Sequence, residues 1–136
     1  MKTTIQKPNA ILDTCVLVDI LHKTKNIEDK ISNLDITKCA ITDLTVFELF
    51  CGAQASNHPQ ENMELIQQLV DSFEIIPTRT GYELAAKEKI RLRKQGKTIE
   101  DIDLLIGCTS MSSEIPIVTG NQKHLGKIHG IQIIPW

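Results

Sequence analysis

Short, almost uninterrupted apolar runs alternate along this chain with longer stretches in which apolar residues recur at helical spacing. Continuous apolar runs are typical of strands that are buried on both faces of a parallel sheet. The pattern predicts five strands, at 9–13, 39–42, 73–76, 115–119 and 131–134. It predicts helices between them, at 15–23, 27–34, 42–54, 59–71, 80–95 and 98–112. This order indicates an α/β fold, with helices covering both faces of a parallel sheet.

Residues at the predicted helix ends support these boundaries. Thr42 or Asp43 is expected to be the N-cap of the third helix, and Gly96 is expected to terminate the fifth. Thr98 is expected to cap the sixth helix, with Asp101 completing an approximate capping box.

Length and composition indicate an ordinary soluble domain. The chain has 136 residues, of which 41% are hydrophobic and 24% charged, so we expect one domain spanning residues 1–136. No apolar stretch approaches the roughly 18 residues of a membrane span, and residues 1–8 lack the apolar segment of a signal peptide. We therefore expect a cytoplasmic protein without a membrane partner. The net charge of −2 argues against a surface built for duplex DNA.

The four cysteines form no C-x-x-C pair and have apolar neighbours in the sequence. This spacing supports neither a zinc site nor a disulfide framework in a reducing compartment. We expect all four to be buried structural thiols.

Carboxylates interrupt three of the apolar runs, at Asp13, Glu48 and Asp103. Burying an ionised carboxylate is unfavourable unless a cation or hydrogen bonds compensate it. Asp13 lies at the exit of the first strand, Glu48 lies in the helix after the second, and Asp103 lies in the first turns of the helix that precedes the fourth. Asn121 lies two residues beyond the fourth strand. Because ligands of open parallel sheets bind beyond the carboxyl ends of the strands, these side chains are expected to share one pocket.

Such a pocket suits Mg²⁺ or Mn²⁺, which prefer oxygen ligands, and it suggests hydrolysis of a phosphodiester bond. Each acid also has an ordinary explanation: Asp13 as a helix cap, Glu48 on an exposed face, and Asp103 favouring a helix N-terminus. Asp19 has equally apolar neighbours but lies inside its helix. We expect Asp19 to be solvated or paired within that helix.

A basic strip is the second candidate feature. It comprises six cations within eleven positions, namely Lys87, Lys89, Arg91, Arg93, Lys94 and Lys97. One interpretation is a solvated helix face, paired with Glu83 and Glu88. The other is a surface that follows the phosphates of RNA.

Five segments in register resemble the PIN-domain family, and within it the VapC-type toxin ribonucleases. They are ILDTCVLVD at 11–19, ITDLTVFELFCGA at 41–53, DLLIGCT at 103–109, IVTGN at 117–121 and IIPW at 133–136.

The resemblance implies an α/β/α sandwich with a five-stranded parallel sheet, so that residues 1–136 form a single PIN domain. It also implies a Mg²⁺- or Mn²⁺-dependent endoribonuclease that forms a homodimer and is inhibited by a small cognate antitoxin. Asp13, Glu48 and Asp103 match metal-binding positions, and Thr119 and Asn121 match positions that support the site.

This chain departs from the family pattern at several positions. Asn121 stands where many relatives carry a fourth acid, and Asp101 is a candidate to compensate for it. His124 and Leu125 replace a frequent Asp-Phe, and Cys15 replaces a frequent Asn.

The leading hypothesis is a toxin-like endoribonuclease in which Asp13, Glu48 and Asp103 bind the metal and Asn121 orients a water or ligand. The alternative is a non-catalytic PIN-like module that binds RNA or protein through a degenerate metal site. A phosphatase with an aspartyl nucleophile needs a second Asp two residues after the first, where this chain has Cys15. Transfer, ribosomal and messenger RNA all remain possible substrates.

Overall fold

A computed structural model of the chain describes residues 6–136. Its strands are β1 (Ala10–Leu12), β2 (Cys39–Thr42), β3 (Glu74–Ile76), β4 (Ile117–Thr119) and β5 (Ile133–Pro135). They form one sheet in the order β3-β2-β1-β4-β5, and every neighbouring pair is parallel. The chain therefore builds outward from β1 to one edge and then returns to add β4 on the other side of β1. The strand order reverses between β1 and β4, which is where sheets of this type bind ligands.

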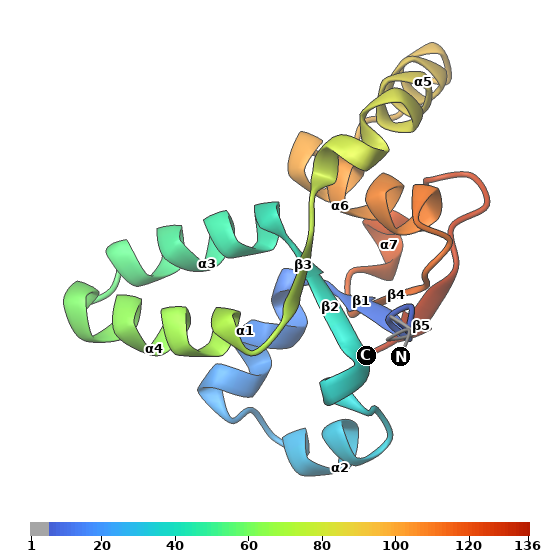
Figure 1. Cartoon of the computed structure of the whole chain (residues 1–136). Coiled ribbons are helices and arrows are strands. Elements are labelled where there is room, and N and C mark those ends of the chain that lie inside the picture. The colour runs from blue at the N-terminus through green and yellow to red at the C-terminus, as the bar shows by residue number, and fades with distance from the viewer. Residues whose placement is uncertain (1–5) are drawn as a thin grey trace, which may run out of the picture.

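Seven helices flank the sheet in the described residues. They are α1 (Thr14–His22), α2 (Ile27–Ser32), α3 (Asp43–Gln54), α4 (Pro59–Asp71), α5 (Tyr82–Lys94), α6 (Asp101–Ser112) and α7 (Gln122–Leu125). Two short 3₁₀ segments, η1 (Ile36–Lys38) and η2 (Thr78–Gly81), precede β2 and α5. In Figure 1, α3 and α4 run side by side and project away from the sheet, while α5, α6 and α7 gather on the opposite side. No helix among residues 6–136 is long and apolar enough to cross a bilayer.

Two apolar cores lie on the two faces of the sheet. One packs α1, α3 and α4 against β1, β2 and β4, and the other packs α5, α6 and α7 against β4 and β5. Adjacent residues of β4 serve different cores: Val118 belongs to the first and Ile117 to the second, and both are buried. This alternation is expected for a strand covered on both faces, and the predicted α/β/α sandwich is confirmed.

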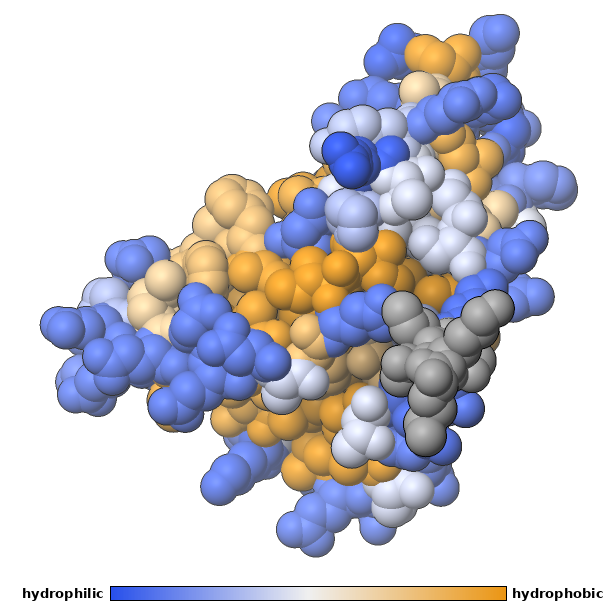
Figure 2. Space-filling model, viewed as in Figure 1, coloured by the Kyte–Doolittle hydropathy of each residue, from blue (hydrophilic) through white to orange (hydrophobic). Residues whose placement is uncertain are grey.

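Both edge strands of the sheet, β3 and β5, have exposed residues. β3 pairs with β2 alone, and its residues Glu74 and Ile75 are exposed. Figure 2, viewed from the same side as Figure 1, shows apolar residues gathered at the middle of the molecule with hydrophilic residues around them.

Most predicted helix ends are confirmed. The Thr42 hydroxyl accepts a hydrogen bond from the backbone N of Thr45 at 3.3 Å, so Thr42 caps α3. Gly96 follows the end of α5 with φ = 69°, a left-handed conformation that glycine adopts readily.

The predicted Thr98 cap of α6 is wrong. The helix begins at Asp101, and the residue at its N-cap position is Glu100. The Glu100 side chain makes no capping hydrogen bond, so the predicted capping box does not form. Long-range contacts occupy this segment instead, since Lys127 Nζ donates to the Thr98 carbonyl at 2.9 Å and Lys89 Nζ donates to the Asp101 carboxylate at 2.8 Å.

The expectation that every cysteine is buried is also wrong. Cys39 and Cys108 are buried and Cys15 is partly buried, but Cys51 is exposed on α3. All four are free thiols, as the spacing predicted.

Candidate metal centre

Asp13 is fixed at the point where the strand order reverses. Its backbone N donates to the Val118 carbonyl at 3.0 Å, which continues the pairing of β1 with β4. Its Oδ1 accepts from the Thr14 backbone N at 2.8 Å, and its Oδ2 accepts from the Thr119 hydroxyl at 2.7 Å. The residue is 5% exposed. Asp13 therefore caps α1, as the ordinary explanation proposed, and also presents a buried carboxylate at the switch point.

Glu48 reaches the same region from α3. The Thr14 hydroxyl donates to Glu48 Oε1 at 2.6 Å and lies 3.0 Å from the Thr45 hydroxyl. Because the Thr14 proton goes to the carboxylate, Thr45 donates to Thr14. Two hydroxyls thus link α1 with α3 and hold the Glu48 side chain beside Asp13.

Asp103 completes the acidic group from the first turn of α6. Burial raises the pKa of Asp103, and the negative charges of Asp13, Glu48 and Glu100 raise it further. Three acids far apart in sequence therefore interact electrostatically in the folded chain. The structure brings together the three carboxylates that the sequence singled out.

Asn121 joins the group beyond the end of β4. Its backbone N donates to the Thr119 hydroxyl at 2.9 Å, and the same hydroxyl donates to Asp13. Its Nδ2 lies 3.4 Å from Asp103 Oδ2, at the long end of hydrogen-bond distances. Thr119 and Asn121 therefore connect Asp13 with Asp103.

His124 is a neighbour of the site that the sequence did not assign. Its Nδ1 lies 2.6 Å from Asn121 Oδ1, and its positive charge partly offsets the raised pKa of Asp103. The signal available in the sequence was its position three residues after Asn121.

Asp101 and Asp19 are engaged elsewhere. Asp101 is exposed and pairs with Lys89, so Asn121, and not Asp101, contacts Asp103. Asp19 Oδ2 accepts from the indole Nε1 of Trp136 at 2.8 Å. The prediction that Asp19 is solvated or paired within its helix is wrong, because its partner is the last residue of the chain.

The donor set fits a hydrated hard cation. Within residues 6–136, no Lys, Arg or His forms an ion pair with Asp13, Glu48 or Asp103. In the same range, no three carboxylate, imidazole or thiol groups enclose a metal position as they stand. Mg²⁺ does not require such a cage, since it commonly keeps several waters and uses one or two carboxylates. The residues therefore fit a metal bound partly through water.

The basic strip is half neutralised. Lys87 pairs with Glu83 at 3.5 Å, Lys89 with Asp101 at 2.8 Å, and Arg91 with Glu88 at 2.7 Å. The remaining three, Arg93, Lys94 and Lys97, are exposed at the C-terminal end of α5 and just beyond it. The solvated and paired helix face is the correct interpretation for Lys87 with Glu83, whereas Lys89 pairs with Asp101 of α6 and the Glu88 partner of Arg91 is buried.

A groove of about 290 Å³ leads from Glu48 between α1, α3 and α4. Most of its lining is apolar and comes from Val18, Leu21, Leu49, Gly52, Ala53, Leu65 and Ile66. Leu65 is 56% exposed at its outer side. The groove offers an apolar surface that ends at one of the three candidate metal ligands.

Comparisons with known proteins agree with this architecture. The sequence profile of the PIN domain matches residues 10–128. The chain is 25% identical to "tRNA(fMet)-specific endonuclease VapC" of Salmonella typhimurium, over 91% of this chain and 93% of that protein. It is 29% identical to "Ribonuclease VapC1" of Methanocaldococcus jannaschii, over 94% of this chain and 88% of that protein.

Solved structures of VapBC complexes contain chains with a fold similar to this one. The DNA-bound VapBC complex of Salmonella typhimurium contains a chain with a TM-score of 0.82 and 25% identity, covering 95% of this chain and 98% of that one. VapBC-1 of nontypeable Haemophilus influenzae contains a chain with a TM-score of 0.79 and 25% identity, covering 93% and 97%. Because the profile match extends over most of the sequence and its predicted fold is confirmed, the chain belongs to the PIN-domain family.

Proposed function

We propose that this protein is a metal-dependent endoribonuclease and the toxin of a toxin–antitoxin pair. The observation that carries the proposal is the convergence of Asp13, Glu48 and Asp103 at the strand-order reversal, where hydrogen bonds through Thr14, Thr119 and Asn121 link them. No basic side chain in residues 6–136 forms an ion pair with these acids. The names of the similar VapC proteins, which are a tRNA(fMet)-specific endonuclease and ribonucleases, support the reaction.

In this mechanism Asp13, Glu48 and Asp103 would hold Mg²⁺ or Mn²⁺. Such a cation supplies an activated water and stabilises negative charge on a phosphoryl group. Thr119 keeps Asp13 oriented, and Thr14 does the same for Glu48. Asn121 lies beside Asp103, where its amide can orient a water or an RNA oxygen.

Cleavage of RNA in the presence and absence of a chelator tests this assignment. Wild-type protein should cleave RNA with Mg²⁺ or Mn²⁺ and stop when EDTA is added. Transfer RNA is the first substrate to try, because a similar protein is named for it. Asp13→Asn should abolish cleavage while the protein stays folded, and undiminished cleavage by this variant would exclude Asp13 from the site.

The proposed antitoxin partner fits the groove between α1, α3 and α4. The similar solved chains come from toxin–antitoxin complexes, and here an apolar surface ends at the anionic Glu48. We propose that the antitoxin places an apolar segment in this groove and a basic side chain near Glu48. Leu65→Glu should weaken binding of the purified protein encoded beside this gene and leave RNA cleavage intact. Equal affinity for both forms would rule out the groove.

The homodimer is also part of the proposal, and light scattering after size exclusion measures it directly. A mass of two chains of 15.2 kDa supports the dimer, and a mass of one chain contradicts it.

A non-catalytic module remains the second candidate because Asn121 stands where many relatives carry a fourth acid. Calorimetric titration with Mn²⁺ separates the two functions. Saturable binding that is lost in Glu48→Ala supports the enzyme, whereas absence of binding by the wild type supports the module.

A further inference from the structure

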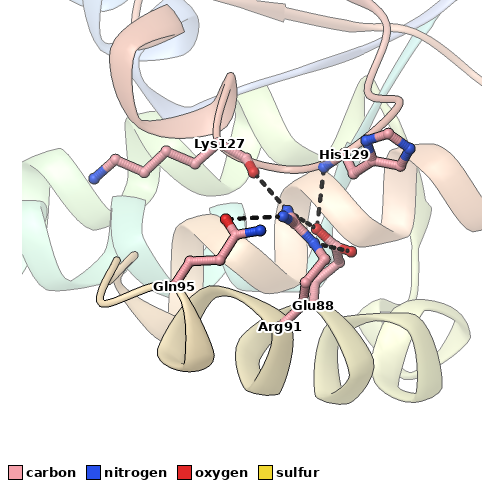
Figure 3. Close-up of polar contacts among 5 residues, drawn as sticks. All are labelled: Glu88, Arg91, Gln95, Lys127 and His129. Atoms are coloured by element: carbon pink, nitrogen blue, oxygen red, sulfur yellow. Dashed lines mark hydrogen bonds and ion pairs between the residues drawn. The ribbon is translucent and has the colours of Figure 1, made fainter.

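Helix α5 contains an ion pair that the proposed reaction does not use, with a buried carboxylate at Glu88 and a partly exposed guanidinium at Arg91. Glu88 is 7% exposed, and its two carboxylate oxygens accept from Arg91 Nε at 2.9 Å and Nη2 at 2.7 Å. Pairs one turn apart on a helix are usually exposed and contribute little to stability. This one is turned toward the protein, as Figure 3 shows. The burial of the Glu88 carboxylate indicates that this pair does more than keep one face of the helix solvated.

Both members of the pair also hold the backbone of the link between α7 and β5. Glu88 Oε2 accepts from the His129 backbone N at 3.0 Å, and Arg91 Nη2 donates to the Lys127 carbonyl at 2.9 Å. In Figure 3 the guanidinium lies between the Glu88 carboxylate and this carbonyl. The path of the link is therefore set by side chains of another helix.

Two lysines, Lys127 of this link and Lys89 of α5, contact the segment between α5 and α6 and the start of α6. Lys127 Nζ donates to the Thr98 carbonyl at 2.9 Å, and Lys89 Nζ pairs with Asp101 at 2.8 Å. The first contact joins the two links to each other, and the second joins α5 to the first residue of α6. One link leads directly into the first turn of α6, which carries Asp103, and the other follows α7, which begins next to Asn121.

Apolar packing alone does not fix how these two segments are oriented. Gly107 of α6 lacks a side chain, and a Cβ there would lie 2.5 Å from Ile128 Cδ1, so the segments approach closely. Apolar contacts are non-directional, whereas hydrogen bonds depend strongly on angle. The Asn121–Asp103 contact is already long at 3.4 Å, so a small rotation of either segment would break it.

We propose that Glu88 and Arg91 form a positioning pair, which holds the segments carrying Asp103 and Asn121 in the arrangement that binds the metal. The inference rests on the proposed function, because it assigns these two residues to the site. Neither Glu88 nor Arg91 contacts substrate or metal, and both act through the backbone of residues 127–129.

The test compares Glu88→Gln with Glu83→Gln in the full-length protein. Both changes replace a carboxylate by an amide on α5, but Glu83 is exposed and pairs with Lys87 on the same helix. Hydrogen exchange with EDTA present measures the mobility of the two links without metal. Calorimetric titration with Mn²⁺ measures the affinity of the site.

Glu88→Gln should accelerate exchange in peptides covering 97–103 and 121–131, while exchange in α1 and α3 stays at the wild-type rate. It should also weaken Mn²⁺ binding by about tenfold, the lower end of losses seen for residues that orient metal ligands. Glu83→Gln should change neither measurement.

Wild-type exchange in both links of Glu88→Gln would overturn the inference, and so would faster exchange combined with wild-type Mn²⁺ affinity. If Asp103→Asn loses Mn²⁺ binding but Glu88→Gln retains it, the positioning pair is wrong and the proposed function stands. Absence of Mn²⁺ binding by the wild type overturns both.

Discussion

Replacing Asp103 by Asn should have opposite effects on stability with and without metal. In the folded chain this carboxylate is partly buried and repelled by Asp13 and Glu48, and both effects raise its pKa. A raised pKa means that the ionised form opposes folding at neutral pH. Asn removes this charge at almost constant volume. Without metal, the variant should therefore be the more stable protein.

The expected gain is about 1 kcal/mol, within the range found when an unfavourable functional-site or surface charge is removed. Solvent reaches part of the Asp103 side chain, and screening keeps the gain at this level. For a domain of this length, that corresponds to an increase in Tm of about 3–4 °C. At 100 times its Kd, a bound cation would add about 2.7 kcal/mol to the wild type and much less to the variant. With the cation bound, the wild type should therefore be more stable than Asp103→Asn.

The pH dependence of this effect has a defined sign. The cost of ionised Asp103 is fully present above its raised folded pKa, and it disappears as the pH falls through that value toward the ordinary 3.8. The stability advantage of Asp103→Asn should therefore shrink on acidification. Urea unfolding in EDTA and in Mn²⁺, with Asp29→Asn on exposed α2 as the matched control, measures all three effects. A wild type that is more stable than Asp103→Asn in EDTA, with equal stabilisation of both by Mn²⁺, would refute the reasoning.

Three further predictions concern the supporting contacts. Thr14→Val should weaken Mn²⁺ binding by about tenfold in calorimetry, because Glu48 loses its 2.6 Å hydrogen bond, and Thr14→Ser should retain most of the affinity. Gly81→Ala should lower the free energy of unfolding by about 1–3 kcal/mol, because its Cβ would lie 2.6 Å from a backbone N of α6, while Gly52→Ala, with open space, should not destabilise. Hydrogen bonds from Arg91 lower the pKa of Glu88, so its stabilising contribution is present above the ordinary pKa of 4.5 and is lost as the pH falls through the lowered value. Glu88→Gln should therefore lose about 1–3 kcal/mol at pH 7 in urea unfolding, and equal stability of the two forms at pH 7 would contradict this.

The sheet could be predicted because its signal is local. The three central strands are short apolar runs that are buried on both faces, and recognising such a run needs no knowledge of the partner strand. The same holds for Thr42 at the start of α3 and for Gly96 after α5, where one residue type determines the helix end. By contrast, α7 has four residues, too few for a helical period to be visible in the sequence.

Failures occurred where a distant residue determines the outcome. Asp19 was expected to be solvated or paired within its own helix, but its carboxylate accepts a hydrogen bond from Trp136, far away in the sequence. Thr98 was expected to cap α6, but the helix begins at Asp101, which pairs with Lys89, and Lys127 binds the Thr98 carbonyl. Such contacts depend on the tertiary structure, so they cannot be predicted from the local sequence.

The candidate site lies between these two cases. Apolar neighbours identified Asp13, Glu48 and Asp103, and the rule for parallel sheets placed them at one edge. The hydroxyl contacts of Thr14 and Thr119 and the position of His124 required the folded chain.

Cleavage of transfer RNA by wild type, Asp103→Asn and Asp29→Asn, each with Mn²⁺ and with EDTA, tests the central claim most directly. Asp29 is exposed on α2, so its variant controls for the loss of one negative charge. The account predicts Mn²⁺-dependent cleavage by the wild type and Asp29→Asn, and none by Asp103→Asn. Cleavage by Asp103→Asn at the wild-type rate, or wild-type cleavage that persists in EDTA, would contradict it.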